Sequence, residues 1–132
     1  VAERICAGPG SRAYGAYTAK LALWGQVTGR FEVGRGSFLP PPHVDSAVVR
    51  IDRAPMADPK TGLDLTPSQL DWVARVIDAA FAQRRKTIRN SLSACGFERP
   101  RLDEAFARSG IAPTIRAESL SPSDFVSLAD AL

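Results

Sequence analysis

The sequence predicts an α/β segment followed by a small all-α unit. Two patterns support this prediction. Before residue 54, apolar and polar residues alternate in two stretches, which is typical of β-strands. After residue 65, apolar residues recur every three or four positions, which is typical of amphipathic helices. With 132 residues, 45% of them hydrophobic, the chain is long enough to form one compact unit.

The α/β segment begins with two predicted helical stretches. Val1–Ala7 resembles the end of a helix, and Gly8–Gly10 closes it because proline cannot continue a helix and glycine accepts a left-handed turn. A second helix is predicted over Ala16–Trp24 and ends at Gly25. The aromatic residues of this region are expected to pack rather than to contact a ligand: Tyr14, Tyr17 and Trp24.

Two strands follow and are expected to pair antiparallel. They span Val27–Val33 and Val44–Ile51, and the loop between them contains Gly34, Gly36 and the prolines Pro40–Pro42. A two-stranded ribbon has no independent core. The pair therefore needs a further sheet, helices or a second copy of the chain against it.

The C-terminal part, residues 66–132, is predicted to form about four helices. Residues 55–65 are rich in proline, glycine and aspartate and are predicted to link it to residues 1–54. Thr66 is a suitable N-cap before Pro67, and the apolar stripe of this helix is Leu70, Val73, Ile77, Ala80 and Phe81. The other helices are predicted over residues 86–94, 100–109 and 122–131, the last with a capping box of Ser121 and Asp124.

Basic residues concentrate in one block. Arg84–Arg101 carries six basic residues and one acidic residue, whereas the whole chain has a net charge of only +3. No acidic residue lies between Asp78 and Glu98, so the cations within Phe81–Leu92, which are Arg84, Arg85, Lys86 and Arg89, have no acidic helical partner three or four positions away. A phosphate-binding surface and a solvated basic face both fit this pattern.

The stretch Phe81–Leu92, which contains four of these cations, is compatible with one helical face. Phe81, Ile88 and Leu92 then share one face, and the cations lie on its flanks. In this arrangement Asn90 and Ser91 would add neutral hydrogen-bond donors for phosphate.

Phe38 is the second candidate site residue. Proline fixes its own φ and favours an extended residue before it, so the stretch Leu39–Pro42 is predicted to be stiff. Phe38, at its base, either buries in a core or stacks on a planar ligand such as a nucleobase.

Several other classes of protein find no support in the sequence. No apolar run is long enough for a bilayer and no secretory signal is visible, so a soluble cytoplasmic protein without a membrane partner is expected. Two distant cysteines and the single His43 give neither a disulfide scaffold nor a metal site. No catalytic motif is present. The start at Val1, without methionine, suggests a fragment.

Four blocks of the sequence together resemble one family. They are VAERICAGPGSRAYG (1–15), SFLPPPHVDSAVVRI (37–51), AFAQRRKTIRNSL (80–92) and RAESLSPSDF (116–125). In this order they are similar to the C-terminal half of the rRNA adenine N6,N6-dimethyltransferases of the KsgA/RsmA type. The resemblance covers nearly the whole chain.

The resemblance implies a fold and an activity. Residues 1–54 would be the last helix and the antiparallel strand pair of a Rossmann-like methyltransferase sheet, and residues 66–132 a helical rRNA-binding domain. The whole enzyme would use S-adenosylmethionine to dimethylate two adjacent adenosines of small-subunit rRNA in ribosome biogenesis. Its partners would be that rRNA and the small ribosomal subunit. The family's glycine-rich cofactor loop and NLPY-type motif have no counterpart here, so this chain alone is expected to be inactive and to bind no cofactor.

Site residues carry over only where the motifs match. Phe38 corresponds to the family phenylalanine that stacks on the target adenine. The basic block corresponds to a surface that faces rRNA, formed by Arg84, Arg85, Lys86, Arg89 and Asn90. Each of these could instead brace the domain junction, Arg84 above all. Two other functions remain open: a non-catalytic RNA-binding module, and a resistance-type methyltransferase that acts on large-subunit rRNA.

Overall fold

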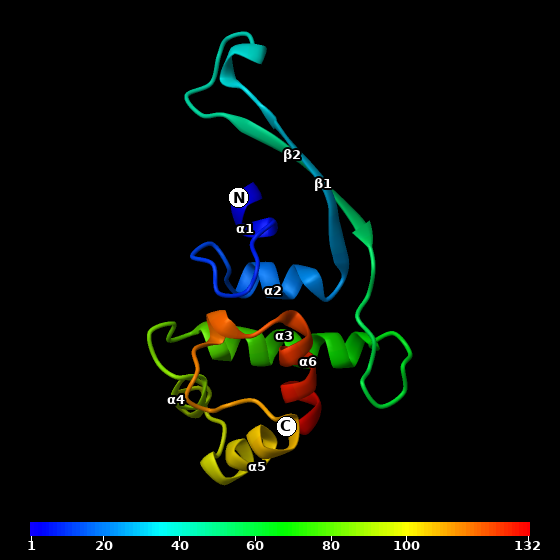
Figure 1. Ribbon diagram of the computed structural model, residues 1–132, viewed down its shortest axis with the longest axis vertical. Helices are drawn as coiled ribbons and strands as arrows, with labels where there is room; N and C mark the ends of the chain where they lie inside the picture. Colours follow the sequence, from blue (N-terminus) through cyan, green and yellow to red (C-terminus); the bar gives the residue numbers. More distant parts are fainter.

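A long two-stranded hairpin stands on a body of helices in the computed structural model, which describes residues 1–132 (Figure 1). Two short helices, α1 (Ala2–Ile5) and α2 (Ala16–Ala22), lie between the hairpin and the C-terminal helices. The predicted order, an α/β segment followed by a helical unit, is confirmed.

The hairpin consists of β1 (Gly25–Val33) and β2 (Ser46–Arg53), which pair antiparallel as predicted. The register runs from Gly25 opposite Arg53 to Val33 opposite Ser46, with an irregularity between Val27 and Gly29. β2 begins two residues later than predicted. Asp45 instead belongs to the loop, where its carboxylate accepts a hydrogen bond from the Arg35 backbone N–H at 3.0 Å.

Apolar side chains of the hairpin remain in contact with solvent. Phe31 is 61% exposed, and its cross-strand partner Val48 is 47% exposed. None of the hairpin residues belongs to the buried core. These exposed apolar side chains agree with the expectation that the strand pair needs a further layer of structure against it.

The second helix of the chain, α2, ends two residues earlier than predicted. α2 stops at Ala22, because the strand begins at Gly25. Tyr14 packs as expected, with its hydroxyl donating to the Leu120 carbonyl at 2.7 Å. Tyr17 and Trp24 are about half exposed, so the expectation that they pack is wrong within this chain.

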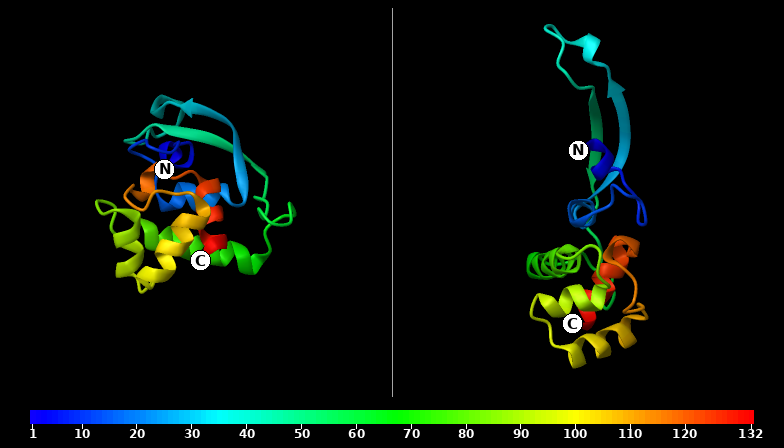
Figure 2. Two further views of the ribbon diagram at one scale, coloured as in Figure 1. Left: turned by 60° about the horizontal axis from the view of Figure 1, so that its bottom comes forward. Right: turned by 90° about the vertical axis from the view of Figure 1, so that its left-hand side faces the viewer.

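Four helices form the C-terminal body: α3 (Pro67–Phe81), α4 (Ile88–Ala94), α5 (Arg99–Ser109) and α6 (Pro122–Ala131). Both predicted N-caps are present, since Thr66 accepts from the Gln69 N–H and Ser121 accepts from the Asp124 N–H. Figure 2 shows the helices gathered at one end of the long axis and the hairpin extending to the other.

One core of 20 buried residues connects the helical body to the first part of the chain. Most of its members come from α3 to α6, and Tyr14, Ala19 and Leu23 join it from α2 and its flanks. The stripe predicted for α3 is buried at Leu70, Val73, Ile77 and Ala80, with Phe81 partly buried beside it.

Residues 55–65 are held by specific hydrogen bonds. Ala57 and Asp64 form an isolated bridge, and Leu65 is buried in the core. The Asp58 carboxylate accepts from the Lys60 N–H at 2.9 Å and from the Gln69 side-chain amide at 2.7 Å. These bonds lower the pKa of the Asp58 carboxyl and tie the segment to the start of α3.

No helix combines the length and the apolar character that a bilayer crossing requires. No group of three or more His, Cys, Asp or Glu side chains is placed to hold a metal ion.

Candidate nucleic-acid interface

The cations of the basic block lie on a turn between two helices. α3 ends at Phe81 and α4 begins at Ile88, so the prediction of one continuous helical face over Phe81–Leu92 is wrong. Thr87 explains the break: its side chain accepts a hydrogen bond from the Asn90 N–H at 3.3 Å and caps a new helix. Arg84, Arg85 and Lys86 therefore lie on the turn that precedes this cap.

Ser91 fixes the shape of this turn from the inside. Its side chain is fully buried, its hydroxyl donates to the Ala79 carbonyl at 2.7 Å, and it accepts from the Gln83 N–H at 3.2 Å. The suggestion that Ser91 donates to phosphate is wrong, because its hydrogen-bonding capacity is used inside the protein.

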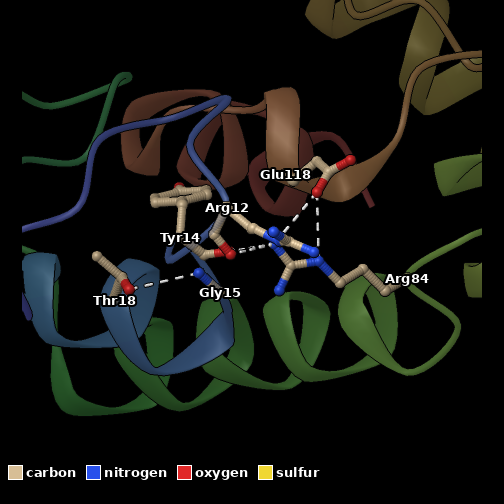
Figure 3. A network of polar contacts seen from close by, with 6 residues as sticks. All are labelled: Arg12, Tyr14, Gly15, Thr18, Arg84 and Glu118. Carbon is tan, nitrogen blue, oxygen red and sulfur yellow. Dashed lines mark hydrogen bonds and ion pairs between the residues drawn. The ribbon is translucent and has the colours of Figure 1, made fainter. Parts of the chain in front are cut away.

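Arg84 connects three separate segments of the chain (Figure 3). Its Nη2 donates to the Tyr14 carbonyl at 2.8 Å and to the Arg12 carbonyl at 3.1 Å. Its Nε and Nη2 both lie 3.2 Å from the Glu118 carboxylate. The bracing interpretation of Arg84 thus has a defined geometry, while its Nη1 makes no hydrogen bond within the protein.

Arg89 also has an internal partner. Its Nε and Nη2 donate to the two carboxylate oxygens of Asp103 on α5, at 2.6 and 3.1 Å. This two-pronged contact raises the pKa of Arg89 and lowers that of Asp103. Asp103 lies 14 positions along the chain, so helical spacing of three or four residues could not indicate it as the partner of Arg89.

Four members of the predicted set are exposed, Arg84 among them, and three of these have no internal side-chain partner: Arg85, Lys86 and Asn90. All three side chains face solvent and none takes part in a hydrogen bond or an ion pair within the chain. We call Arg85 and Lys86 the basic turn. Its charges are free to meet an external anion.

Phe38 lies at the far end of the hairpin. It follows a 3₁₀ turn (Arg35–Ser37), it is 43% exposed, and it lies outside the core. Arg35 closes the base of this loop by donating to the Asp45 carboxylate and to the His43 carbonyl. Burial in a core, one of the two uses considered for Phe38, does not occur in this chain.

The structure does not bring the two candidate sites together. The hairpin end that carries Phe38 and the helical body that carries the basic turn lie at opposite ends of the long axis (Figure 1 and the right-hand view of Figure 2). A single short ligand therefore cannot contact both Phe38 and the basic turn within this chain, whereas an extended nucleic acid could.

Residues 1–132 match the family model described as ribosomal RNA adenine dimethylase. The chain is 46% identical over 131 residues to a protein of Acidothermus cellulolyticus named ribosomal RNA small subunit methyltransferase A, covering 99% of this chain and 43% of that protein. It is 41% identical to a protein of the same name from Syntrophotalea carbinolica, covering 98% of this chain and 47% of that protein.

Solved structures show the same fold. A dimethyladenosine transferase from Plasmodium falciparum superposes with a TM-score of 0.68 at 24% identity, covering 96% of this chain and 51% of that one. The 23S rRNA methyltransferase ErmE superposes with a TM-score of 0.59 at 21% identity, covering 90% and 46%.

The chain spans less than half the length of the two curated relatives. The family model nevertheless matches every residue from 1 to 132, including the hairpin, the basic turn and the segment that holds Glu118. This chain therefore belongs to the ribosomal RNA adenine dimethylase family.

Proposed function

We propose that this chain is the C-terminal part of an rRNA (adenine-N6,N6)-dimethyltransferase that modifies two adjacent adenosines of small-subunit rRNA in the cytoplasm during ribosome biogenesis. The match of the family model to all 132 residues is the observation that carries the proposal. Relatives at 41 and 46% identity are named as small-subunit rRNA methyltransferases. Residues 1–54 would complete the methyltransferase domain, 55–65 would link, and 66–132 would contact rRNA.

The groove beside α1 and α2 does not fit S-adenosylmethionine. A groove of about 400 Å³ lies between α1, α2, the hairpin and the start of α6, and nine of its 15 lining residues are hydrophobic. None of the lining residues is acidic, whereas nucleotide-type cofactors are commonly held by a carboxylate on the ribose hydroxyls and a glycine-rich loop. The cofactor of the whole enzyme would bind to residues outside this chain.

Phe38 would stack on the target adenine. An enzyme that modifies a base amine takes the base out of its stack and holds it between flat or apolar side chains. A half-exposed ring on a loop closed by Arg35 and Asp45 suits this use, because the ring is accessible while the base of its loop is fixed. Stacking on one aromatic ring is worth about 1–3 kcal/mol per base.

The five residues predicted to face rRNA would have two different roles. Arg85, Lys86 and Asn90, which have no internal partner, would contact the phosphate backbone of rRNA. Arg84 and Arg89, which already bind Glu118 and Asp103, would hold that surface in place.

Two alternatives compete with this proposal. A non-catalytic RNA-binding module would use the same basic turn without any methyl transfer. A methyltransferase acting on large-subunit rRNA shares the fold, as ErmE does, but at 21% identity that likeness concerns the fold alone. The curated relatives at twice that identity favour the small subunit.

Methyl transfer by the protein in its full natural length tests the proposal. Small ribosomal subunits that lack the modification are incubated with the protein and S-adenosylmethionine, and dimethyladenosine is measured by mass spectrometry of the digested rRNA. We expect two dimethylated adenosines per subunit. A protein that binds the subunits without methylating them would be the RNA-binding module, and methylation of large-subunit rRNA alone would support the resistance-type enzyme.

Phe38→Ala tests the stacking role in the same assay. We expect methyl transfer to fall by about five- to 150-fold, from the loss of about 1–3 kcal/mol of stacking, while affinity for the subunit changes by less than about twofold. Leu39→Ala is the matched control, because Leu39 is 98% exposed on the same loop. Equal losses of affinity and of methyl transfer would argue against stacking.

A further inference from the structure

Arg12 lies beside the basic block although 72 residues separate it from Arg84. Its carbonyl oxygen accepts a hydrogen bond from Arg84 Nη2 at 3.1 Å. The two residues belong to different portions of the chain: Arg12 to the loop between α1 and α2, and Arg84 to the turn between α3 and α4. Figure 3 shows them at the meeting point of these segments.

The loop that carries Arg12 is fixed on both sides. Before it, the Gly10 N–H donates to the Glu118 carbonyl at 2.7 Å. After it, the Tyr14 carbonyl accepts from Arg84, and the Tyr14 hydroxyl donates to the Leu120 carbonyl. The backbone around Arg12 is therefore held by four hydrogen bonds, two to Arg84 in the α3–α4 turn and two to carbonyls of the segment 118–120 that precedes α6.

The side chain of Arg12 is free. It is exposed and forms neither an ion pair nor a hydrogen bond within the chain. Glu118, the carboxylate at this junction, is already paired with Arg84. The charges of Arg12, Arg85 and Lys86 are thus uncompensated by any acidic side chain within salt-bridge distance.

We propose that Arg12 is a further RNA-contacting residue, and that Arg84 positions it so that one phosphate-binding surface runs from the α1–α2 loop to the basic turn. This rests on the proposed function and extends its phosphate-binding surface from the helical part to residues 1–54, where only the base contact of Phe38 had been proposed. The ligand is the phosphate backbone of small-subunit rRNA, because uncompensated arginine and lysine side chains spread over two segments suit a chain of phosphates better than a single anion.

The surface gives bound RNA a structural role. Arg84, which adjoins the basic turn in sequence, is bonded to the loop that carries Arg12, so RNA that meets Arg12 and the basic turn bridges the same junction that Arg84 closes. Binding would then hold the two portions in one orientation. The rRNA substrate would then stabilise the relative orientation of the two portions in which methylation takes place.

The test measures the salt dependence of binding with the protein in its full natural length. The probes are a protein-free transcript of small-subunit rRNA and the intact small subunit. We expect Arg12→Ala to weaken binding to both about three- to tenfold near 0.1 M salt, and to reduce the slope of log K against log salt by about 0.7–0.9, the value of one phosphate contact. Arg108→Ala, an exposed α5 arginine without an ion pair, is the control and leaves the slope unchanged.

A double-mutant cycle tests the positioning role of Arg84. Arg84→Lys keeps the charge but cannot reproduce the forked contact to two carbonyls and a carboxylate. If Arg84 acts through Arg12, the loss caused by Arg12→Ala is much smaller in the Arg84→Lys background than in the wild type. Fully additive losses would overturn this part of the proposal.

The outcomes separate this inference from the proposed function. An unchanged slope for Arg12→Ala, together with reduced slopes for Arg85→Ala and Lys86→Ala, would overturn the inference and leave the RNA interface of the helical part intact. Unchanged slopes for all three would overturn both. A loss confined to the intact subunit, with normal binding to the protein-free transcript, would assign Arg12 to an acidic ribosomal protein and also overturn the inference.

Discussion

The helical body and the hairpin of this chain differ in how they bury their apolar residues. In the body, side chains such as Ile77, Leu92 and Phe125 are fully buried. In the hairpin, Phe31 and Val48 face each other across the strands and remain about half exposed or more. Both regions have an apolar sequence pattern, but only one of them closes a core with the elements of this chain.

This difference shows that an apolar pattern predicts burial only when the partner layer is present. A helix of the body finds three others at short sequence distance, whereas a sheet needs neighbouring strands and covering helices. The chain spans 43–47% of the length of its curated relatives, so the hairpin's exposure agrees with a sheet of which it is only a part.

The comparison can be tested with a matched pair of phenylalanine replacements. Phe125→Ala removes a fully buried ring from the body and is expected to lower the free energy of unfolding by about 3–5 kcal/mol. Phe31→Ala removes a ring that is 61% exposed and is expected to change it by less than about 0.5 kcal/mol. Urea denaturation of this chain, followed by circular dichroism, measures both.

Similar losses for the two variants would show that the hairpin is buried in solution, for instance against a second copy of the chain. The dependence of the unfolding midpoint on protein concentration would then identify the association.

Most of the fold could be predicted because its signals are local. The N-caps Thr66 and Ser121 and the glycine after α5 act within a few residues, and the periodicity of α3 spans 15 residues. The position of Tyr17 and Trp24 could not be predicted, because the length of α2 and the face that it turns to the core depend on packing against α3. Local propensity does not contain that information.

A smaller effect is expected where the two regions meet, at Tyr14. Burial, and secondarily the charge of Asp124, raises the pKa of this phenol to about 12. The unfolded chain, with a pKa near 10, loses the proton first, so stability falls as the pH rises from about 10 to about 12. The full difference corresponds to roughly 2–3 kcal/mol.

Tyr14→Phe should remove this pH dependence. At pH 8 the variant is expected to be less stable by about 1 kcal/mol, because the hydrogen bond to the Leu120 carbonyl is lost. Its deficit should disappear or reverse above pH 11. Tyr17→Phe is the control, because Tyr17 is exposed, and denaturant curves at pH 8, 10 and 11.5 provide the comparison. An identical pH profile for wild type and Tyr14→Phe would contradict the burial of the phenol.

The candidate site was less predictable than the fold for a physical reason. The residue types of the basic block indicated an anionic partner, and the structure leaves Arg85 and Lys86 free for one. The partners of Arg84 and Arg89 could not be deduced, because Glu118 and Asp103 approach from other elements at separations of 34 and 14 residues. Charge counting along the sequence therefore overestimates how many cations are available.

The smallest expected effect is a difference in melting temperature between replacing an ion-paired arginine, Arg89, and replacing an unpaired one, Arg85. Arg89→Gln breaks the contact with Asp103 and should lower the melting temperature slightly at neutral pH, whereas Arg85→Gln should not change it. Because the Asp103 pKa is lowered in the folded state, the contribution of this pair is present above the unfolded pKa near 4 and is lost as the pH falls through the folded value. The two variants should therefore differ in melting temperature at pH 7, and the difference should shrink as the pH falls below about 4.

For RNA affinity we expect the reverse order, with the larger loss in Arg85→Gln. The guanidinium of Arg85 is not paired with a carboxylate, so no ion pair has to break before it binds a phosphate. If Arg89→Gln instead lost more affinity than Arg85→Gln at unchanged melting temperature, Arg89 would exchange Asp103 for RNA on binding, and the ion pair would describe only the free protein.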